Sequence, residues 1–120
     1  MGSTFSGAIT ADGIKTMATY TGAINLNGQT FTFGTGGMVL DNGTGSTFVL
    51  GAATISITNG PLDNKDYTGW NANTSSITVN GTSSVTSKYQ NSFYNLTFAA
   101  GSNVTIAADW VWVGHLLTLN

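Results

Sequence analysis

The side chains that could do acid–base or metal chemistry are few in this sequence and stand far apart. The 120 residues contain three Lys, five Asp and one His, and they contain no Glu, Arg or Cys. Enzymes that move protons or phosphates need titratable groups gathered at one point. The ionic residues instead follow one another singly along the chain, as Lys15, Lys65, Lys88, Asp12, Asp41, Asp63, Asp66 and Asp109. The sequence therefore predicts a scaffold rather than an enzyme, with no catalytic residue and no cofactor.

Neither the histidine nor the paired carboxylates form a recognisable site. His115 has no other metal ligand nearby in the sequence and no orienting partner, so we expect it to have a structural or surface role. Asp63 and Asp66 offer the two carboxylates that calcium sites and glycoside hydrolases use. Their spacing matches no calcium loop, however, and Pro61 followed by Asp and Asn is typical of a turn. Asp41 likewise opens an Asn-Gly turn, so no metal site is expected.

Other classes of function are disfavoured by composition. Three separated lysines cannot supply the clustered positive charge that binds phosphates, and the formal net charge is -2. The glycines from Gly34 to Gly37 are followed by no Lys, and no Gly-x-Ser-x-Gly elbow is present. No run of 18 apolar residues occurs. We therefore expect no nucleic-acid partner and no membrane span.

The tryptophans are the strongest candidates for contact with a partner. Trp110 and Trp112 stand two apart, with Val111 and Val113 on the opposite face of an extended chain. A narrow core accepts Val more readily than two indoles, which predicts that the indoles point outward, where large apolar area usually marks a contact. The partner is a second subunit, more of the same assembly, or a sugar ring stacked on the indole, with Trp70 as a third platform. The alternative is that a loop containing Trp70 covers the pair.

These residues must be positioned by β-strands, because the apolar period is two almost throughout. Short turns rich in Gly and Asn separate the strands, and successive pairs begin roughly seven to eight residues apart. The apolar pairs are Ile24/Leu26, Phe31/Phe33, Met38/Leu40, Phe48/Leu50, Ile55/Ile57, Ile77/Val79, Leu96/Phe98, Val104/Ile106 and Leu117/Leu119. This spacing is tighter than that of a typical sandwich.

Two all-β architectures fit such a pattern. An antiparallel β-sandwich or jelly roll joins its strands by hairpins, whereas a parallel β-solenoid pairs each short strand with its equivalent one coil later. Short strands, tight uneven turns and inward alternation of Val, Ile, Leu and Phe favour the solenoid. The remaining Thr, Ser and Asn would then form outward rows that need no charge. We predict a parallel β-solenoid with short strands, and the sandwich remains the alternative.

The second half of the chain resembles a known class of repeats. Residues 76–82, 92–98, 103–106 and 116–120 are similar to the Thr/Asn/Gly repeats of secreted right-handed β-helix proteins, which occur in bacterial adhesins, autotransporter passengers and phage tail fibres or spikes. This resemblance covers roughly residues 76–120. It implies a right-handed solenoid on an extracellular surface or a virion, and it implies no reaction. The first 75 residues fit loosely, because residues 60–74 would loop out of the stack, and a sandwich stays open for that half.

We therefore expect residues 1–120 to form one β domain that is a piece of, or a subunit in, a larger assembly. The predicted function is a non-enzymatic structural module, and its partners are further copies or other chains of the same assembly. The end of the chain supports this, because Leu117 to Asn120 form a strand with no visible cap, and an open β edge is a template for pairing. The alternative is a carbohydrate-binding module that takes cell-surface glycans on Trp110, Trp112 and Trp70.

Ice binding is a third hypothesis, carried by Thr-x-Thr pairs such as Thr19/Thr21 and Thr30/Thr32. A flat lattice match requires that such pairs recur at a steady interval. In the sequence they do not, so we expect no such match.

Overall fold

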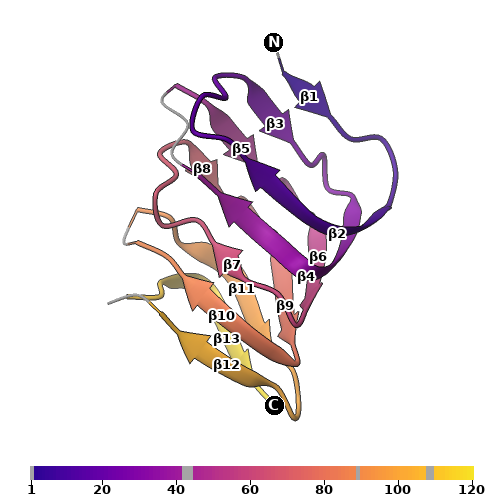
Figure 1. The fold of residues 1–120 in the computed structure, drawn as a ribbon, viewed down its shortest axis with the longest axis vertical. Helices are drawn as coiled ribbons and strands as arrows, with labels where there is room; N and C mark the ends of the chain where they lie inside the picture. Colours follow the sequence, from indigo (N-terminus) through magenta and orange to yellow (C-terminus); the bar gives the residue numbers. More distant parts are fainter. Residues whose placement is uncertain (1, 42–44, 89, 108–109) are drawn as a thin grey trace.

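The computed structural model describes residues 2–41, 45–88, 90–107 and 110–120, and in these the chain forms only strands and turns. Every strand pair is parallel, and the chain winds through about five turns of a β-solenoid (Figure 1). The prediction of a parallel solenoid is therefore confirmed. The strands are β1 (Ser3–Thr4), β2 (Ile9–Thr16), β3 (Ala23–Asn25), β4 (Thr30–Leu40), β5 (Thr47–Val49), β6 (Thr54–Thr58), β7 (Leu62–Asp63), β8 (Trp70–Asn71), β9 (Ser76–Asn80), β10 (Thr82–Thr86), β11 (Phe93–Phe98), β12 (Asn103–Ile106) and β13 (Val113–Leu119).

Each coil contributes to three faces of the stack. Face A consists of β1, β3, β5 and β8. Face B consists of the first parts of β2 and β4, followed by β6, β9, β11 and β13. Face C consists of the second parts of β2 and β4, followed by β7, β10 and β12. The long strand β4 thus bends from face B to face C.

All the coils wind in the same direction and have the same handedness. In Figure 1 the strands of face C cross the front from right to left, the chain returns behind them, and successive coils descend. This makes the solenoid right-handed, the hand that parallel crossovers almost always take. Equivalent residues of neighbouring coils lie 19 to 24 positions apart, and hydrogen bonds such as Gly51 to Asn73 and Thr82 to Asn59 join them. Three strands spaced seven to eight residues apart therefore make one coil.

The core is a set of inward rows, one side chain per coil. On face B the row Phe31, Ile55, Ile77 and Leu96 is almost completely buried. Burying each such side chain contributes about 1.5–3 kcal/mol. On face A the row is aromatic, because Phe48 stacks on Trp70 with ring centroids 6.1 Å apart and Phe93 meets Trp70 edge-on at 5.8 Å. The core is therefore built by similar side chains stacked from coil to coil, whereas in a sandwich the side chains of two packed sheets interdigitate.

Asn and Gly make the corners, because these turns need a positive φ. Between faces A and B, Asn27 and Asn73 have φ values of 53° and 47°. Between faces B and C, Asn59 has φ 57° and Gly81, one coil later, has φ 66°. The Asn59 Oδ1 accepts a hydrogen bond from the Thr82 N–H at 2.9 Å, so successive corners are joined. These residues tolerate left-handed backbone at low cost.

The structure excludes the alternative left open for the first 75 residues, and one expectation about them is wrong. No sandwich forms there, because β2, β3 and β4 all pair in parallel with strands of the next coil. Residues 60–74 also stay in the stack, since they contain β7 and β8, and both Leu62 and Tyr67 are fully buried. Strands of two residues are too short to show an alternating pattern, which is why the segment reads as irregular.

Candidate functional site

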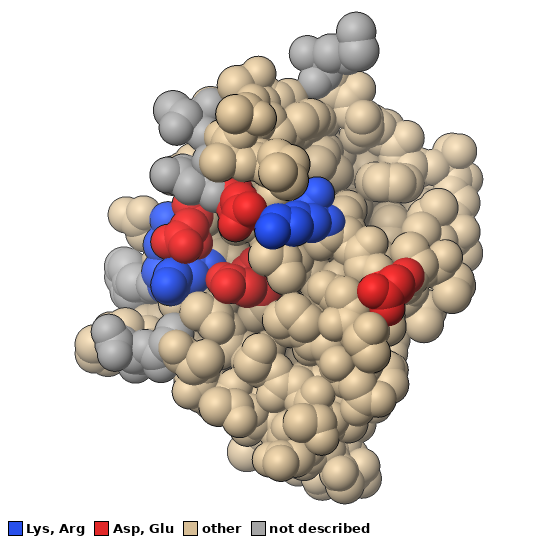
Figure 2. Space-filling model, viewed as in Figure 1, with Lys and Arg blue, Asp and Glu red and all other residues tan. Residues whose placement is uncertain are grey.

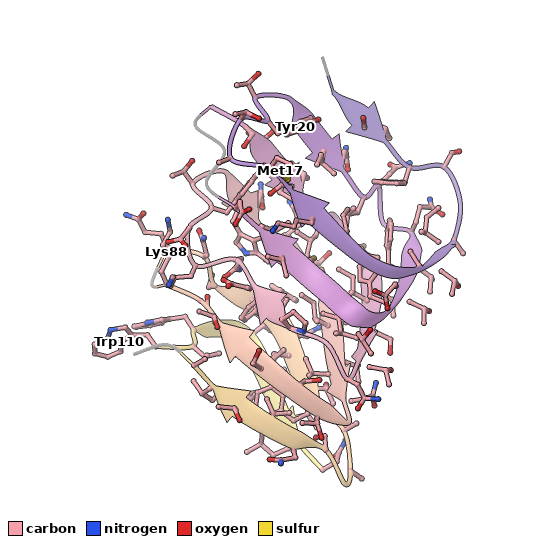
Figure 3. The ribbon with its side chains drawn as sticks, in the orientation of Figure 1. Met17, Tyr20, Lys88 and Trp110 are labelled. Atoms are coloured by element: carbon pink, nitrogen blue, oxygen red, sulfur yellow. The ribbon has the colours of Figure 1, made fainter. Side chains whose placement is uncertain are left out.

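The indoles of Trp110 and Trp112 lie exposed just before β13. Their exposed fractions are 62% and 43%, whereas Val111 and Val113 are partly buried against the core. The alternation of outward Trp and inward Val that the sequence predicts is therefore present. Figure 3 shows Trp110 pointing away from the ribbon, at the corner where the chain passes from face C back to face A. Asp109, which precedes Trp110 in the sequence, lies outside the described residues.

Trp70 is placed differently from this pair. Its Nε1 donates a hydrogen bond to the carbonyl oxygen of Ser92 at 2.7 Å, and its ring stacks on Phe48 inside face A. An indole N–H that donates a hydrogen bond in this way fixes the orientation of the ring. Trp70 therefore belongs to the aromatic row rather than to an exposed platform with Trp110 and Trp112.

The last strands, β12 and β13, leave the inward rows uncovered. Leu117 continues the row of Leu96 and is 47% exposed, and Ile106 continues the row of Val85 and is 45% exposed. Leu119 is exposed in the same way. We call Ile106, Leu117 and Leu119, with the free edges of β12 and β13, the C-terminal end face. The residues one coil earlier are Val85 and Leu96, which the core buries fully, and Phe98, which it buries partly.

The opposite end of the stack is hollow. A depression of about 500 Å³ lies between the end of face C and the start of face A, at the same corner as Trp110 but at the first coil. Phe5, Met17, Tyr20 and Ile24 supply most of its apolar lining, and Met17 is 61% exposed. We call this depression the N-terminal hollow. Figure 3 shows Met17 and Tyr20 on the same side of the stack as Trp110.

A smaller groove of about 320 Å³ opens on face A near Trp70. Asn73 and Gln90 line it together with Tyr94, whose ring stacks on His115 at a centroid distance of 4.7 Å. The Nδ1 of His115 lies 2.8 Å from the Oδ1 of Asn95. His115 is thus held by a stacked ring and an amide, with no carboxylate in the contacts described, which agrees with a structural or surface role.

The charged side chains are gathered by the fold although they are scattered in the sequence. Lys15 lies near the end of β2, Asp41 follows β4, Lys65 and Asp66 follow β7, and Lys88 follows β10. Because these positions recur about one coil apart, they stack at the corner that ends face C, and Figure 2 shows most of the charge in one group. Lys15 and Asp41 form an exposed ion pair at 3.6 Å, which contributes little to stability.

This charged corner contains no metal centre in the part of the chain that the structure describes. Over those residues, no group of three or more His, Cys, Asp or Glu side chains lies close enough to hold an ion. The Asp63 Oδ1 instead accepts the backbone N–H of Lys65 at 3.0 Å, an ordinary turn contact. Residues 42–44 of the turn that begins at Asp41 lie outside the described residues.

Face B carries one of the outward polar rows expected of a solenoid, and the structure shows which hydroxyl groups form it. Equivalent outward positions on the six successive strands of face B are occupied by Thr10, Thr32, Ser56, Thr78, Thr97 and Thr118. The pair Thr30/Thr32 is repeated by Thr54/Ser56 and by Ser76/Thr78. The interval along the chain is uneven, as the sequence indicates, because these pairs lie 24 and then 22 residues apart, yet the stack aligns them. The signal is hidden because Ser replaces Thr at several places and the coils differ in length.

Tyr67 is the one described group whose ionisation is clearly altered. Burial raises the pKa of its phenol, and the nearby Ser46 side chain partly offsets this rise. The ring is fully buried beside Phe48 at a centroid distance of 6.1 Å. Tyr67 is therefore a core residue and offers no reactive group to solvent.

Comparisons of the chain with protein-family models, with curated proteins and with solved structures found no match. Within the described ranges, no helix is long and apolar enough to cross a membrane. The function must therefore be inferred from the geometry of the stack and of its two ends.

Proposed function

We propose that this chain is a non-enzymatic structural module of an extracellular surface or virion assembly, such as an adhesin repeat or a phage fibre, spike or decoration protein. One observation carries the proposal. Leu96 is fully buried by the coil that follows it, whereas Leu117, the next member of the same row, is 47% exposed. Exposed rows of large apolar side chains beside free strand edges favour pairing with another chain.

The rest of the molecule fits this role. Its stability comes from backbone ladders and apolar rows, and only a few exposed charges are available to titrate. Such a stack is expected to resist changes in pH and salt outside the cell. Because each coil contacts mainly its neighbours, a longer or shorter stack uses the same interactions. A spacer or fibre needs this property, and a catalyst does not.

Changing the two exposed indoles tests the proposal. Trp110→Ala and Trp112→Ala together remove large aromatic area, which at an interface typically costs about 2 kcal/mol or more of association energy. The melting temperature of the monomer should barely change on loss of the Trp110 indole, which is 62% exposed, and should fall only modestly on loss of the Trp112 indole, which is 43% exposed. Sedimentation and thermal melting are compared with those of the unchanged chain and of Thr54→Ala, a matched control on face B.

Loss of the oligomer with folding retained supports the proposal. An unchanged oligomer would exclude the indoles from the interface. A chain that stays monomeric without any substitution would contradict the assembly role altogether. A monomer that binds glycans through Trp110 and Trp112 would instead favour the carbohydrate-binding alternative.

A second function, ice binding, is favoured by the hydroxyl row of face B. Strand spacing sets successive hydroxyls about 4.8 Å apart along the row, and alternate residues set the columns about 6.6 Å apart. Two adjacent columns of hydroxyls are present on β4, β6 and β9, and the second column continues with Asn95 and Leu116 on the next two strands. Such an array of hydroxyls can order water in a lattice. Thermal hysteresis of a solution of the chain is the measurement. Thr78→Lys, in the middle of the row, should abolish it, and Ser84→Lys on face C should not.

A further inference from the structure

We infer that the open ends of the stack bind each other, so that the C-terminal end face of one copy docks on the first coil of a second copy. This inference rests on the proposed assembly function and specifies its partner and its polarity. Its starting point is the direction of the strands. β13 and β2 run the same way around the coil, since both belong to one continuous parallel face. A second copy placed head to tail therefore extends the parallel ladder without a change of direction.

The side-chain rows also continue across such a junction. The face B row begins at Ile9 and ends at Leu117, and the neighbouring row begins at Ala11 and ends at Leu119. A second copy would set Ile9 against Leu117 and the small Ala11 against the protruding Leu119. The junction is thus the coil-to-coil contact of the core, repeated once between chains. Exposed leucines at one end meet an Ile and an Ala at the other.

On face C, head-to-tail stacking of two copies would likewise extend a side-chain row, with one isoleucine against another. This row begins at Ile14 and ends at Ile106, after passing through Met38, Leu62 and Val85. Ile14 is partly buried and Ile106 is 45% exposed. Contact between them would complete the burial of both, which is a favourable change for apolar side chains.

The corner between faces C and A supplies a protrusion and a depression. Trp110 projects from the last coil there, and the N-terminal hollow opens at the same corner of the first coil. Head-to-tail stacking brings the indole over Met17 and Tyr20. A hollow of about 500 Å³ lies within the range of roughly 300–1,000 Å³ that holds small ligands, so an indole fits.

The area is sufficient for a specific contact. The two shorter extents of the molecule, 31 and 25 Å, bound an end face of roughly 600 Å², so two copies bury about 1,200 Å², the lower limit for stable interfaces. Because the two surfaces in contact differ, each added copy leaves a new free end of each kind. Such a heterologous contact that does not close into a ring forms a linear filament.

The test uses two variants, each blocked at one end. Trp110→Ala with Leu119→Lys blocks the C-terminal end face, and Met17→Lys blocks the N-terminal hollow. Met17, Trp110 and Leu119 are each more than half exposed, so the folded monomer should tolerate all three changes, and melting curves verify this. Thr54→Lys adds the same charge on face B and is the matched control. The measurement is sedimentation velocity over a range of concentrations.

We expect the unchanged chain and the control to form a concentration-dependent series of species larger than a dimer. Each blocked variant alone should associate about thirtyfold more weakly and sediment as a monomer. An equal mixture of the two should form a dimer and nothing larger, because one compatible pair of ends remains. A mixture that stays monomeric, or a single blocked variant that dimerises by itself, would overturn the head-to-tail inference while leaving assembly intact. A monomeric unchanged chain would overturn both.

Discussion

Leu96 and Leu117 occupy neighbouring places in one row of face B, yet Leu96 is completely buried and Leu117 is 47% exposed. Leu96→Ala should destabilise the monomer by about 2–5 kcal/mol, because it removes a packed side chain and leaves a cavity. Leu117→Ala should cost less than about 1 kcal/mol, since the surrounding space is already open to solvent. Denaturant unfolding at low protein concentration measures both. Equal costs would show that Leu117 is covered in the monomer.

Corner geometry predicts that Gly81 is intolerant of a side chain. Its φ is 66°, and a Cβ there would lie 2.1 Å from the Asn59 Oδ1. Gly81→Ala must therefore adopt a strained backbone and displace the acceptor of the Thr82 N–H, at a cost of about 1–3 kcal/mol. Gly7→Ala is the control, because nothing lies within 4 Å of its Cβ position. Similar melting temperatures for both variants would refute this account of the corner.

A buried amide pair joins the coils at another point. Asn91 donates from Nδ2 to the carbonyl oxygens of Asn64 and Tyr67, and Asn64 returns a hydrogen bond to the Asn91 carbonyl at 3.1 Å. Asn91→Leu should cost about 1–3 kcal/mol for each carbonyl left unpaired. Gln90→Leu, at the exposed neighbouring position, should leave the free energy of unfolding nearly unchanged. If the two substitutions lower the free energy of unfolding equally, the Asn64–Asn91 pair makes no specific contribution to stability.

Alkaline pH should destabilise the fold through Tyr67. Burial is the main cause that raises the pKa of its phenol above 10, so the folded chain keeps a proton that the unfolded chain loses. The stabilisation is complete below about pH 10 and declines as the pH rises towards the folded-state pKa. Tyr67→Phe should remove this part of the decline in melting temperature, and Tyr94→Phe should retain it. Identical curves for all three chains would show that burial leaves the Tyr67 phenol unaffected.

Much of the fold could be predicted from the sequence, because alternation such as Phe31/Phe33 and Leu96/Phe98 reports directly which side chains face inward. Other features depend on pairing between coils and carry no local signal. The strand β7 has two residues, and β4 turns from one face to the next without a break, so neither can be recognised from a window of sequence. The charged corner and the membership of the hydroxyl row carry no local signal for the same reason: their residues are about 22 positions apart and only the stack brings them together.

Trp70 shows the limit of reasoning from residue type at a candidate site. Its sequence context is no different from that of an exposed indole, and its role is decided by Phe48 and Ser92, each in another coil. Trp110 and Trp112 were easier to predict, because the valines beside them supply the inward-facing side chains locally.

The pairing of each strand with its equivalent in the next coil has a mechanical consequence. When the ends of the stack are pulled apart along its axis, the load reaches one terminal coil at a time, because the ladders act in series. Each coil of about 22 residues would release roughly 70 Å of chain as it peels away. Force–extension curves would then show a series of small, nearly equal steps. The protein would lengthen gradually under tension, one coil at a time.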